Sequence, residues 1–219
     1  MRHAGSPHAA PGRGSLVTVS GIDGGGKSTL IGGLAGLLER GGRLVEVVTP
    51  LKRDPAMLRA LASLPAPPGT DGHWPARREA LVAHHIGTVL LANAVDLVEP
   101  RLAAGVDVLC DRWVWDHLVS QEWFGVDLTG DLDLFRALPR PDLAVLLDLP
   151  AEVAQQRIDR RGDAGVGTGE PFLRFSRQRF LDHADQDGLV VVDGTAPVDA
   201  LLREVQRLAG PVLITGAPR

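Results

Sequence analysis

Residues 21–28 (GIDGGGKS) have the types and the spacing of a loop that binds phosphate groups. They fit the pattern G-x-x-x-x-G-K-[ST], whose glycines let backbone N–H groups turn inward around phosphate oxygens. The lysine of this pattern reaches the β- and γ-phosphates of a nucleoside triphosphate, and the hydroxyl after it binds Mg²⁺. We therefore predict that Lys27 is catalytic and that Ser28 is a Mg²⁺ ligand. The residues predicted to bind the phosphates of ATP are Gly21, Gly24, Gly25, Gly26, Lys27, Ser28 and Thr29.

The residues on either side of this loop predict the setting that phosphate binding requires. The apolar run Leu16–Ser20 (LVTVS) is typical of a buried strand, and the apolar spacing of Ser28–Arg40 is typical of a helix. A helix that begins directly behind the loop presents its positive N-terminal end to bound phosphate. A glycine-rich turn without function is the alternative, and the order strand, loop, helix disfavours it.

Two aspartates end further apolar runs that read as buried strands. Asp111 ends Val106–Asp111 (VDVLCD), and we predict that it is a second Mg²⁺ ligand, with a helix N-cap as the alternative. Asp148 ends Leu143–Asp148 (LAVLLD) and precedes Pro150, so capping and function are equally compatible with it.

The order of apolar runs along the chain predicts an α/β fold. With further strands at residues 44–49 and 188–192, the sheet has five strands separated by helical segments. This rhythm implies a parallel sheet with helices on both faces, as in the three-layer P-loop NTPase fold. The longest helix is expected from about residue 76 towards residue 97, after a Pro- and Gly-rich loop at 64–75, and Pro100 is expected to disturb its end.

Composition limits the class of protein. The chain has 219 residues, 44% of them hydrophobic, which suits one compact domain. A formal charge of −4 argues against binding to a nucleic-acid polymer, and no uninterrupted apolar run approaches the roughly 20 residues that span a membrane. The single cysteine, Cys110, excludes an intramolecular disulfide, so we expect a cytoplasmic protein in which this thiol is inert packing.

Four short motifs carry a resemblance to a known family. They are VSGIDGGGKSTL from residue 19, the triplet Asp111-Arg112-Trp113, Gln121 ten residues after Asp111, and PDL…LD-x-x-x-E over residues 141–152. In these motifs the chain resembles the thymidylate kinase family, a branch of the P-loop nucleoside monophosphate kinases, as a divergent member. We accordingly assign residues 1–14 to a disordered leader, 15–210 to a P-loop kinase domain and 211–219 to a C-terminal tail.

The resemblance implies Mg-ATP as the phosphate donor, a homodimer and a lid at about residues 157–174. It also implies that Asp23 and Arg112 are catalytic residues that contact a small-molecule acceptor. We assign the acceptor site to Asp23, Arg112, Trp113, Gln121 and Lys52. The lid is assigned Arg157, Arg160, Arg161 and Arg174, with Arg161 as a catalytic residue, because arginine stabilises the charge of a transferred phosphoryl group. A solvated basic helix face is the alternative for these arginines.

The sequence departs from this family on the acceptor side. Residues 49–53 (TPLKR) replace an Arg-Glu-Pro-Gly-Gly loop, and Ile86 and Leu90 replace the aromatic residue and the arginine that hold the nucleobase. Asp116 occupies the position of a serine in the DR motif. Isoleucine cannot stack as an aromatic ring does, and leucine cannot donate a hydrogen bond. We therefore expect dTMP to be a poor acceptor.

Together these observations predict an ATP-dependent phosphotransferase. Its expected acceptor is a nucleoside monophosphate such as dTMP, or a modified nucleotide. Two alternatives stay open: a kinase of a non-nucleotide metabolite, and a nucleotide-switched ATP-binding protein without a metabolite acceptor. A GTPase switch would carry an N-K-x-D motif, which this sequence lacks.

Overall fold

The computed structural model describes residues 12–51, 56, 59–60, 63–65, 74–162 and 169–214. Within them the chain forms a parallel five-stranded sheet in the order β2-β3-β1-β4-β5. The predicted fold class is thereby confirmed. The strands are β1 (Leu16–Ser20), β2 (Val45–Val48), β3 (Asp107–Asp111), β4 (Leu143–Asp148) and β5 (Val190–Asp193).

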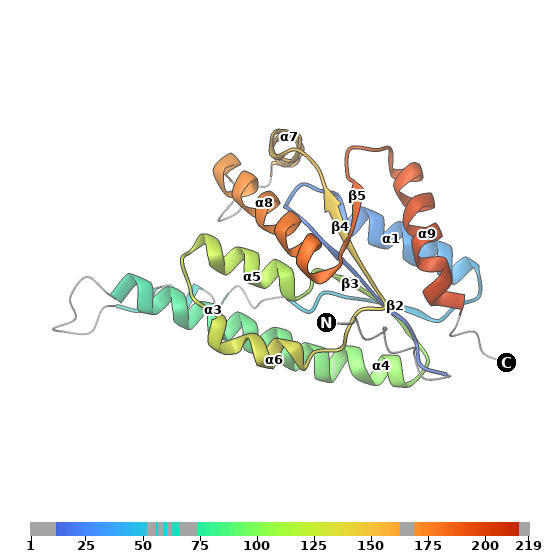
Figure 1. Ribbon diagram of the computed structural model, residues 1–219, viewed down its shortest axis with the longest axis horizontal. Helices are drawn as coiled ribbons and strands as arrows, with labels where there is room; N and C mark the ends of the chain where they lie inside the picture. The colour runs from blue at the N-terminus through green and yellow to red at the C-terminus, as the bar shows by residue number, and fades with distance from the viewer. Residues whose placement is uncertain are drawn as a thin grey trace.

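Helices cover both faces of this sheet, as Figure 1 shows. On one face lie α1 and α9, which pack against each other and against the sheet. The other face carries α3, α4, α5, α6, α7 and α8. The bounds are α1 (Lys27–Arg40), α3 (Trp74–Asn93), α4 (Glu99–Ala103), α5 (Val114–Trp123), α6 (Leu132–Arg136), α7 (Ala151–Arg161), α8 (Glu170–Asp187) and α9 (Val198–Ile214), with a 3₁₀ turn at Thr129–Asp131.

Successive side chains of each strand supply two separate cores, because they point to opposite faces of the sheet. In β4, Leu146 is buried against the helices of the α5 side, whereas Val145 and Leu147 are buried against α1 and α9. Cys110 is fully buried in the first of these cores, and burial, with Asp111 second, raises the pKa of its thiol. Both results agree with the prediction that this cysteine is a packing residue.

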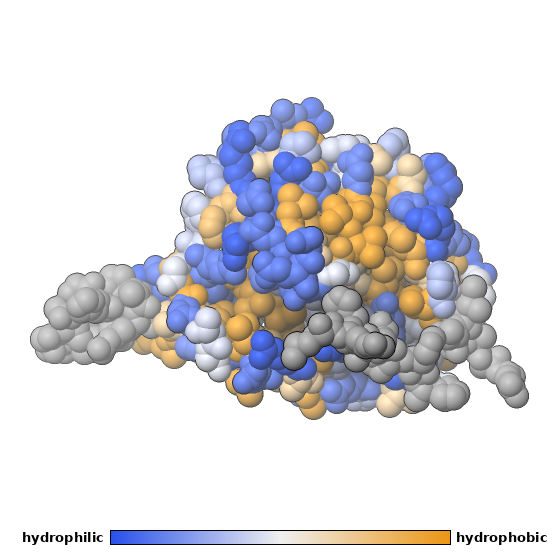
Figure 2. Space-filling view, in the orientation of Figure 1, coloured by the Kyte–Doolittle hydropathy of each residue, from blue (hydrophilic) through white to orange (hydrophobic). Residues whose placement is uncertain are grey.

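The edge strand β5 leaves part of its apolar surface uncovered. Figure 2 shows an apolar region between α8 and α9 on this face of the molecule. Val191 of β5 and Val198 at the start of α9 are 49% and 47% exposed. Apolar residues at this edge of the sheet are therefore less completely buried than those of the central strands.

The long helix is interrupted where Pro100 was expected to disturb it, but it does not end there. A π-helical turn, Ala94–Val98, joins α3 to α4, and Pro100 lies in the first turn of α4. The helical segment Arg78–Ala103 contains an 18-residue window with a mean hydropathy of 1.5, a third of it buried, so by length and composition alone it could cross a membrane. The apolar run itself is interrupted by polar residues such as His84, Asn93 and Asp96, as expected, but the mean over the window stays high. Its buried face contributes Ala83, Ile86, Leu90, Ala94, Val98 and Leu102 to the core.

The described residues extend past both predicted domain limits, residues 15 and 210. Helix α9 continues through Ile214, past the boundary expected at residue 210, with Pro211 inside it. At the other end, the Gly14 N–H donates to the carbonyl of Leu102, and Arg13 lies 3.4 Å from Asp142. Residues 1–11 and 215–219 lie outside the described residues.

Candidate active site

The phosphate-binding motif forms the turn from β1 into α1, at the carboxyl end of the central strand (Figure 1). Three of its glycines, Gly21, Gly24 and Gly26, have positive φ angles of 140°, 79° and 94°. A Cβ at Gly21 would lie 2.6 Å from the carbonyl oxygen of Leu147, and one at Gly24 would lie 2.5 Å from that of Ala154. Glycine is therefore required here both by backbone conformation and by the close approach of β4 and α7.

A cavity of about 300 Å³ opens over this turn. The residues that line it are Asp23, Gly24, Gly25, Gly26, Lys27, Ser28, Thr29, Arg112, Ile158 and Arg161. The fold thus brings all of the predicted phosphate-binding residues except Gly21 together with Asp23, Arg112 and Arg161. The cavity is lined mainly by polar groups and by backbone at the N-terminus of α1, which favours an anionic ligand.

Lys27 is buried in this site and lies along its own loop. Its Nζ donates to the carbonyl oxygens of Gly21 and Ile22, at 2.7 and 2.9 Å, and lies 3.7 Å from Asp23. Burial, followed by the charge of Arg112, lowers the pKa of Lys27 to about 8, although nearby carboxylates oppose the shift. A bound phosphate would place further negative charge beside this ammonium and so stabilise its charged form.

Ser28 and Asp111, the two predicted Mg²⁺ ligands, are in direct contact. The Ser28 hydroxyl donates to Asp111 Oδ2 at 2.6 Å, where β3 ends beside the start of α1. A hydroxyl and a carboxylate oxygen suit Mg²⁺, which takes few protein ligands and keeps several waters. The two side chains therefore fit the ion, although their role as ligands stays a prediction.

Arg112 is held between two carboxylates. Its Nη2 lies 2.5 Å from Asp23 and its Nη1 lies 3.4 Å from Asp116. Its φ of 78° is the one positive φ found at a non-glycine residue in the described part of the chain, and its N–H donates to the carbonyl of Val19. Burial alone would lower the pKa of Arg112, but Asp116 and Asp23 outweigh burial and raise it. The guanidinium is thus permanently charged and closely paired.

Asp116 is the member of this cluster that was not predicted to be a site residue. Its side chain is 2% exposed, and its Oδ2 accepts the N–H of Trp113 at 3.1 Å, which caps α5. Burial raises its pKa, while Arg112 and Lys27 act in the opposite direction. The i,i+4 spacing from Arg112 is the sequence signal that indicates this pairing.

Two of the other residues assigned to the acceptor do not line the cavity. Trp113 is 1% exposed and Gln121 is 5% exposed, and neither lines the cavity. Ile86 and Leu90 are both buried in the core beside α5. Lys52 lies outside the described residues.

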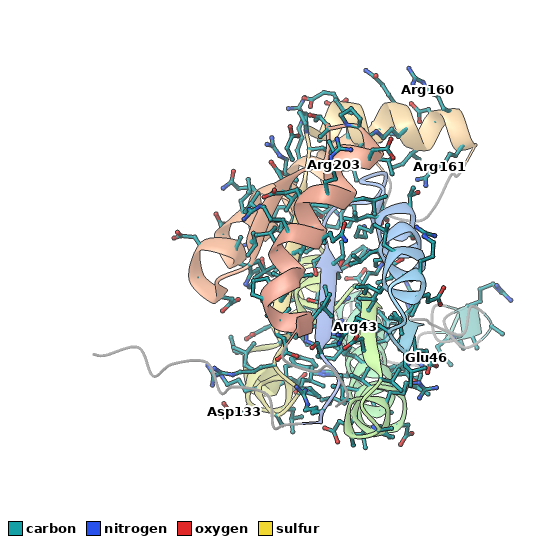
Figure 3. All side chains as sticks on the ribbon, turned by 90° about the vertical axis from the view of Figure 1, so that its right-hand side faces the viewer. Arg43, Glu46, Asp133, Arg160, Arg161 and Arg203 are labelled. Carbon is teal, nitrogen blue, oxygen red and sulfur yellow. The ribbon has the colours of Figure 1, made fainter. Side chains whose placement is uncertain are left out.

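The four lid arginines do not converge on one point. Figure 3 shows Arg160 and Arg161 on different sides of α7, with Arg160 pointing away from the sheet. Arg161 lines the phosphate cavity, whereas Arg157 donates to the carbonyls of Gly194 and Gly25. Arg174 pairs instead with Glu152 and Glu170, beside a separate cavity of about 200 Å³ between α7 and α8. Residues 163–168 of the predicted lid lie outside the described residues.

Asp148 is neither a helix cap nor part of the cavity. Its carboxylate accepts from Nε and Nη2 of Arg177, at 2.7 and 2.9 Å, and no side chain caps α7. This corrects the capping alternative. The bidentate pair ties α8 to the end of β4.

Taken with the fold, the glycine turn and its polar cavity define a P-loop nucleotide-binding protein.

Comparison with known proteins gives the family. A family model described as thymidylate kinase matches residues 19–205. A thymidylate kinase of Xanthomonas campestris is 35% identical over 196 residues, which cover 87% of this chain and 81% of that protein. One of Rhodopirellula baltica is 32% identical over 216 residues, covering 91% and 82%. The chain belongs to the thymidylate kinase family, and it is a kinase.

More distant proteins agree with this assignment. A probable thymidylate kinase of Archaeoglobus fulgidus is 27% identical over 197 residues, which cover 88% of this chain and 93% of that protein. Among solved structures, the chain is similar to a deoxyadenosine kinase from M. mycoides, with a TM-score of 0.62 and 16% identity, covering 90% of this chain and 99% of the other. At that identity the likeness shows the fold alone, which is the P-loop kinase fold predicted from the sequence.

Proposed function

We propose that this kinase transfers the γ-phosphoryl group of Mg-ATP to a small acceptor that bears a phosphate or a hydroxyl group. The observation that carries the proposal is the cavity over the glycine turn, where Lys27, Arg112 and Arg161 surround space for phosphate. In such transfers the protein supplies positioning and charge stabilisation rather than covalent chemistry.

The residues of the cavity divide this work between them. Lys27 leaves the two loop carbonyls that it now contacts and neutralises the oxygens of the γ-phosphate. Arg161 approaches the transferred group from α7, and Arg112 and Asp23 face the acceptor. Ser28 and Asp111 would hold Mg²⁺, and the ion would supply further positive charge for the transfer.

We further propose that dTMP is a poor acceptor. Ile86 and Leu90 are core residues, so the positions that would stack on a base and donate to it offer only apolar packing. Losing a charged hydrogen bond costs about 1.5–3 kcal/mol and losing an aromatic contact about 0.5–1.5 kcal/mol. Together they weaken dTMP by about two to three orders of magnitude.

Formation of ADP by the full-length protein tests both proposals. Nucleosides, nucleoside monophosphates and pooled small metabolites are offered with Mg-ATP, and Lys27→Ala serves as the inactive control. We expect turnover with at least one acceptor, less than a tenth of it in Lys27→Ala, and a kcat/KM for dTMP below about 10⁴ M⁻¹s⁻¹. A higher value for dTMP would restore ordinary thymidylate kinase activity.

The alternative of a non-nucleotide acceptor rests on the same apolar positions, Ile86 and Leu90, and the pooled metabolites in this screen address it. A nucleotide-switched binding protein would instead bind ATP and give no turnover with any acceptor.

The remaining proposals concern assembly and location. A homodimer is supported by the exposed side chains Leu81 and Val95, 45% and 55% exposed, on the apolar segment Arg78–Ala103. Burying this surface in a partner would account for its hydropathy without a membrane. We propose a cytoplasmic enzyme that binds neither a membrane nor a nucleic-acid polymer. Sedimentation of the purified protein without detergent tests the dimer, and a monomer would contradict it.

A further inference from the structure

Asp116 adds a buried negative charge to the acceptor side of the cavity. The resemblance to the family places a neutral serine at this position, whereas the aspartate here contacts Arg112 from beneath, with its side chain 2% exposed. Asp23 contacts the same guanidinium from the cavity side, with its side chain 38% exposed. Arg112 therefore has a carboxylate at each of its two terminal nitrogens.

The charges around this point do not favour a second phosphate. Three carboxylates, Asp23, Asp111 and Asp116, interact with two cations, Lys27 and Arg112. Lys27 and Asp111 face the donor and Arg161 approaches the transferred group, which leaves Arg112 with two carboxylates, Asp23 and Asp116, on the acceptor side among the described residues. A phosphate monoester would bring a further charge of about −2 to this position.

We propose, resting on the function proposed above, that the group which receives the phosphoryl in this enzyme is a nucleoside hydroxyl, and that Asp116 sets this preference. A neutral hydroxyl enters beside Asp23 and Asp116 without like-charge repulsion. A monophosphate must approach two carboxylates whose shared counter-ion is already paired. Asp116 acts through Arg112, and is a specificity-determining residue without contact to the acceptor.

A hydroxyl acceptor also needs a base, which a phosphate dianion does not. Asp23 lines the cavity and is exposed enough to reach the acceptor, whereas Asp116 is not. The hydroxyl oxygen forms the new bond to the γ-phosphorus while the bond to the β–γ bridging oxygen breaks, and ADP leaves with that electron pair. The hydroxyl proton passes to the Asp23 carboxylate and then to water.

The test compares each nucleoside with its own monophosphate. Full-length protein and Mg-ATP are given thymidine or dTMP, deoxycytidine or dCMP, deoxyadenosine or dAMP, and deoxyguanosine or dGMP, and kcat/KM is measured from ADP release. For the base that is used best, we expect the nucleoside to exceed the monophosphate by at least about tenfold. Because both members of a pair carry the same base, their ratio reports the charge of the reacting group.

Two substitutions at Asp116 then test whether this residue sets the ratio of kcat/KM for the nucleoside to kcat/KM for its monophosphate. Asp116→Asn keeps an acceptor for the Trp113 N–H but removes the charge, and Asp116→Ser introduces the residue of the family. Each is expected to move the ratio towards the monophosphate by at least about tenfold. Asp133→Asn on α6, whose side chain is 88% exposed and pairs with Arg136, is the matched control and should leave the ratio unchanged.

The outcomes separate this inference from the proposed function. Preference of the wild-type protein for a monophosphate would overturn the inference and leave the kinase proposal standing. A ratio that is the same in wild type and in a folded Asp116 variant would overturn the role of Asp116. No ADP with any acceptor would overturn the proposed function and the inference with it. The wild-type ratio decides the acceptor class even if neither Asp116 variant folds.

Discussion

Binding of ATP should weaken as the pH rises above 8, because Lys27 loses its proton in the ligand-free protein. Burial lowers the pKa of this lysine from 10.5 to about 8. If only the protonated form binds phosphate, the apparent Kd rises by about eightfold between pH 7.5 and pH 9. The terminal phosphate of ATP titrates at about pH 6 and contributes little to this window.

Titration of fluorescent ATP into the protein at a series of pH values measures this effect. Lys27→Arg is the matched variant, since an arginine stays charged throughout the range. Lys27→Arg should bind ATP with lower affinity at neutral pH, but its Kd should change by less than about twofold over the same interval. A flat profile for the wild-type protein, or an equally steep one for Lys27→Arg, would show that the lysine does not titrate near 8.

Three further substitutions test separate parts of the site. Lys27→Met should raise the Tm of the ligand-free protein by several degrees at pH 7, because the depressed pKa means that the charged lysine destabilises the folded state. For the same reason the wild-type protein should gain stability between pH 8 and 10.5, where the unfolded state binds more protons than the folded state. Arg112→Ala should raise the KM of the acceptor far more than the Kd of ATP, and the reverse result in steady-state and binding assays would place it on the donor side. Gly24→Ala, whose Cβ would lie 2.5 Å from the Ala154 carbonyl at a φ of 79°, should lower stability by about 1–3 kcal/mol in urea denaturation and abolish ATP binding, whereas Gly32→Ala in α1 should not destabilise.

The central strands could be predicted from the sequence because they are buried on both faces. Leu16–Ser20 and Leu143–Asp148 were expected with the bounds that the structure has. The edge strands were less accurate: β5 runs from 190 to 193, against an expected 188–192. An edge strand mixes exposed and buried residues, and Val191 is 49% exposed, so the apolar run does not mark its ends.

The ion pairs of the site could be predicted only in part. Lys27, Ser28 and the glycines follow one another in sequence, so one pattern places them all. Arg177, by contrast, binds Asp148 because α8 packs across β4, and no local pattern indicates that packing. Arg174 is equally basic and three residues away, yet the carboxylates of Glu152 and Glu170 hold it outside the phosphate cavity. Which arginine reaches which carboxylate depends on tertiary contacts.

The position of β1 in the sheet has a consequence for synthesis of the chain. This strand is made first, but its two neighbours come much later: Leu16 pairs with Val108 and Val17 pairs with Leu143. Such distant pairing is slow to form, and an unpaired apolar strand is prone to aggregation. The nascent chain therefore leaves the ribosome with its nucleotide-binding turn unsupported until β4 has emerged. We therefore expect the nascent chain to be most prone to aggregation between synthesis of β1 and synthesis of β4.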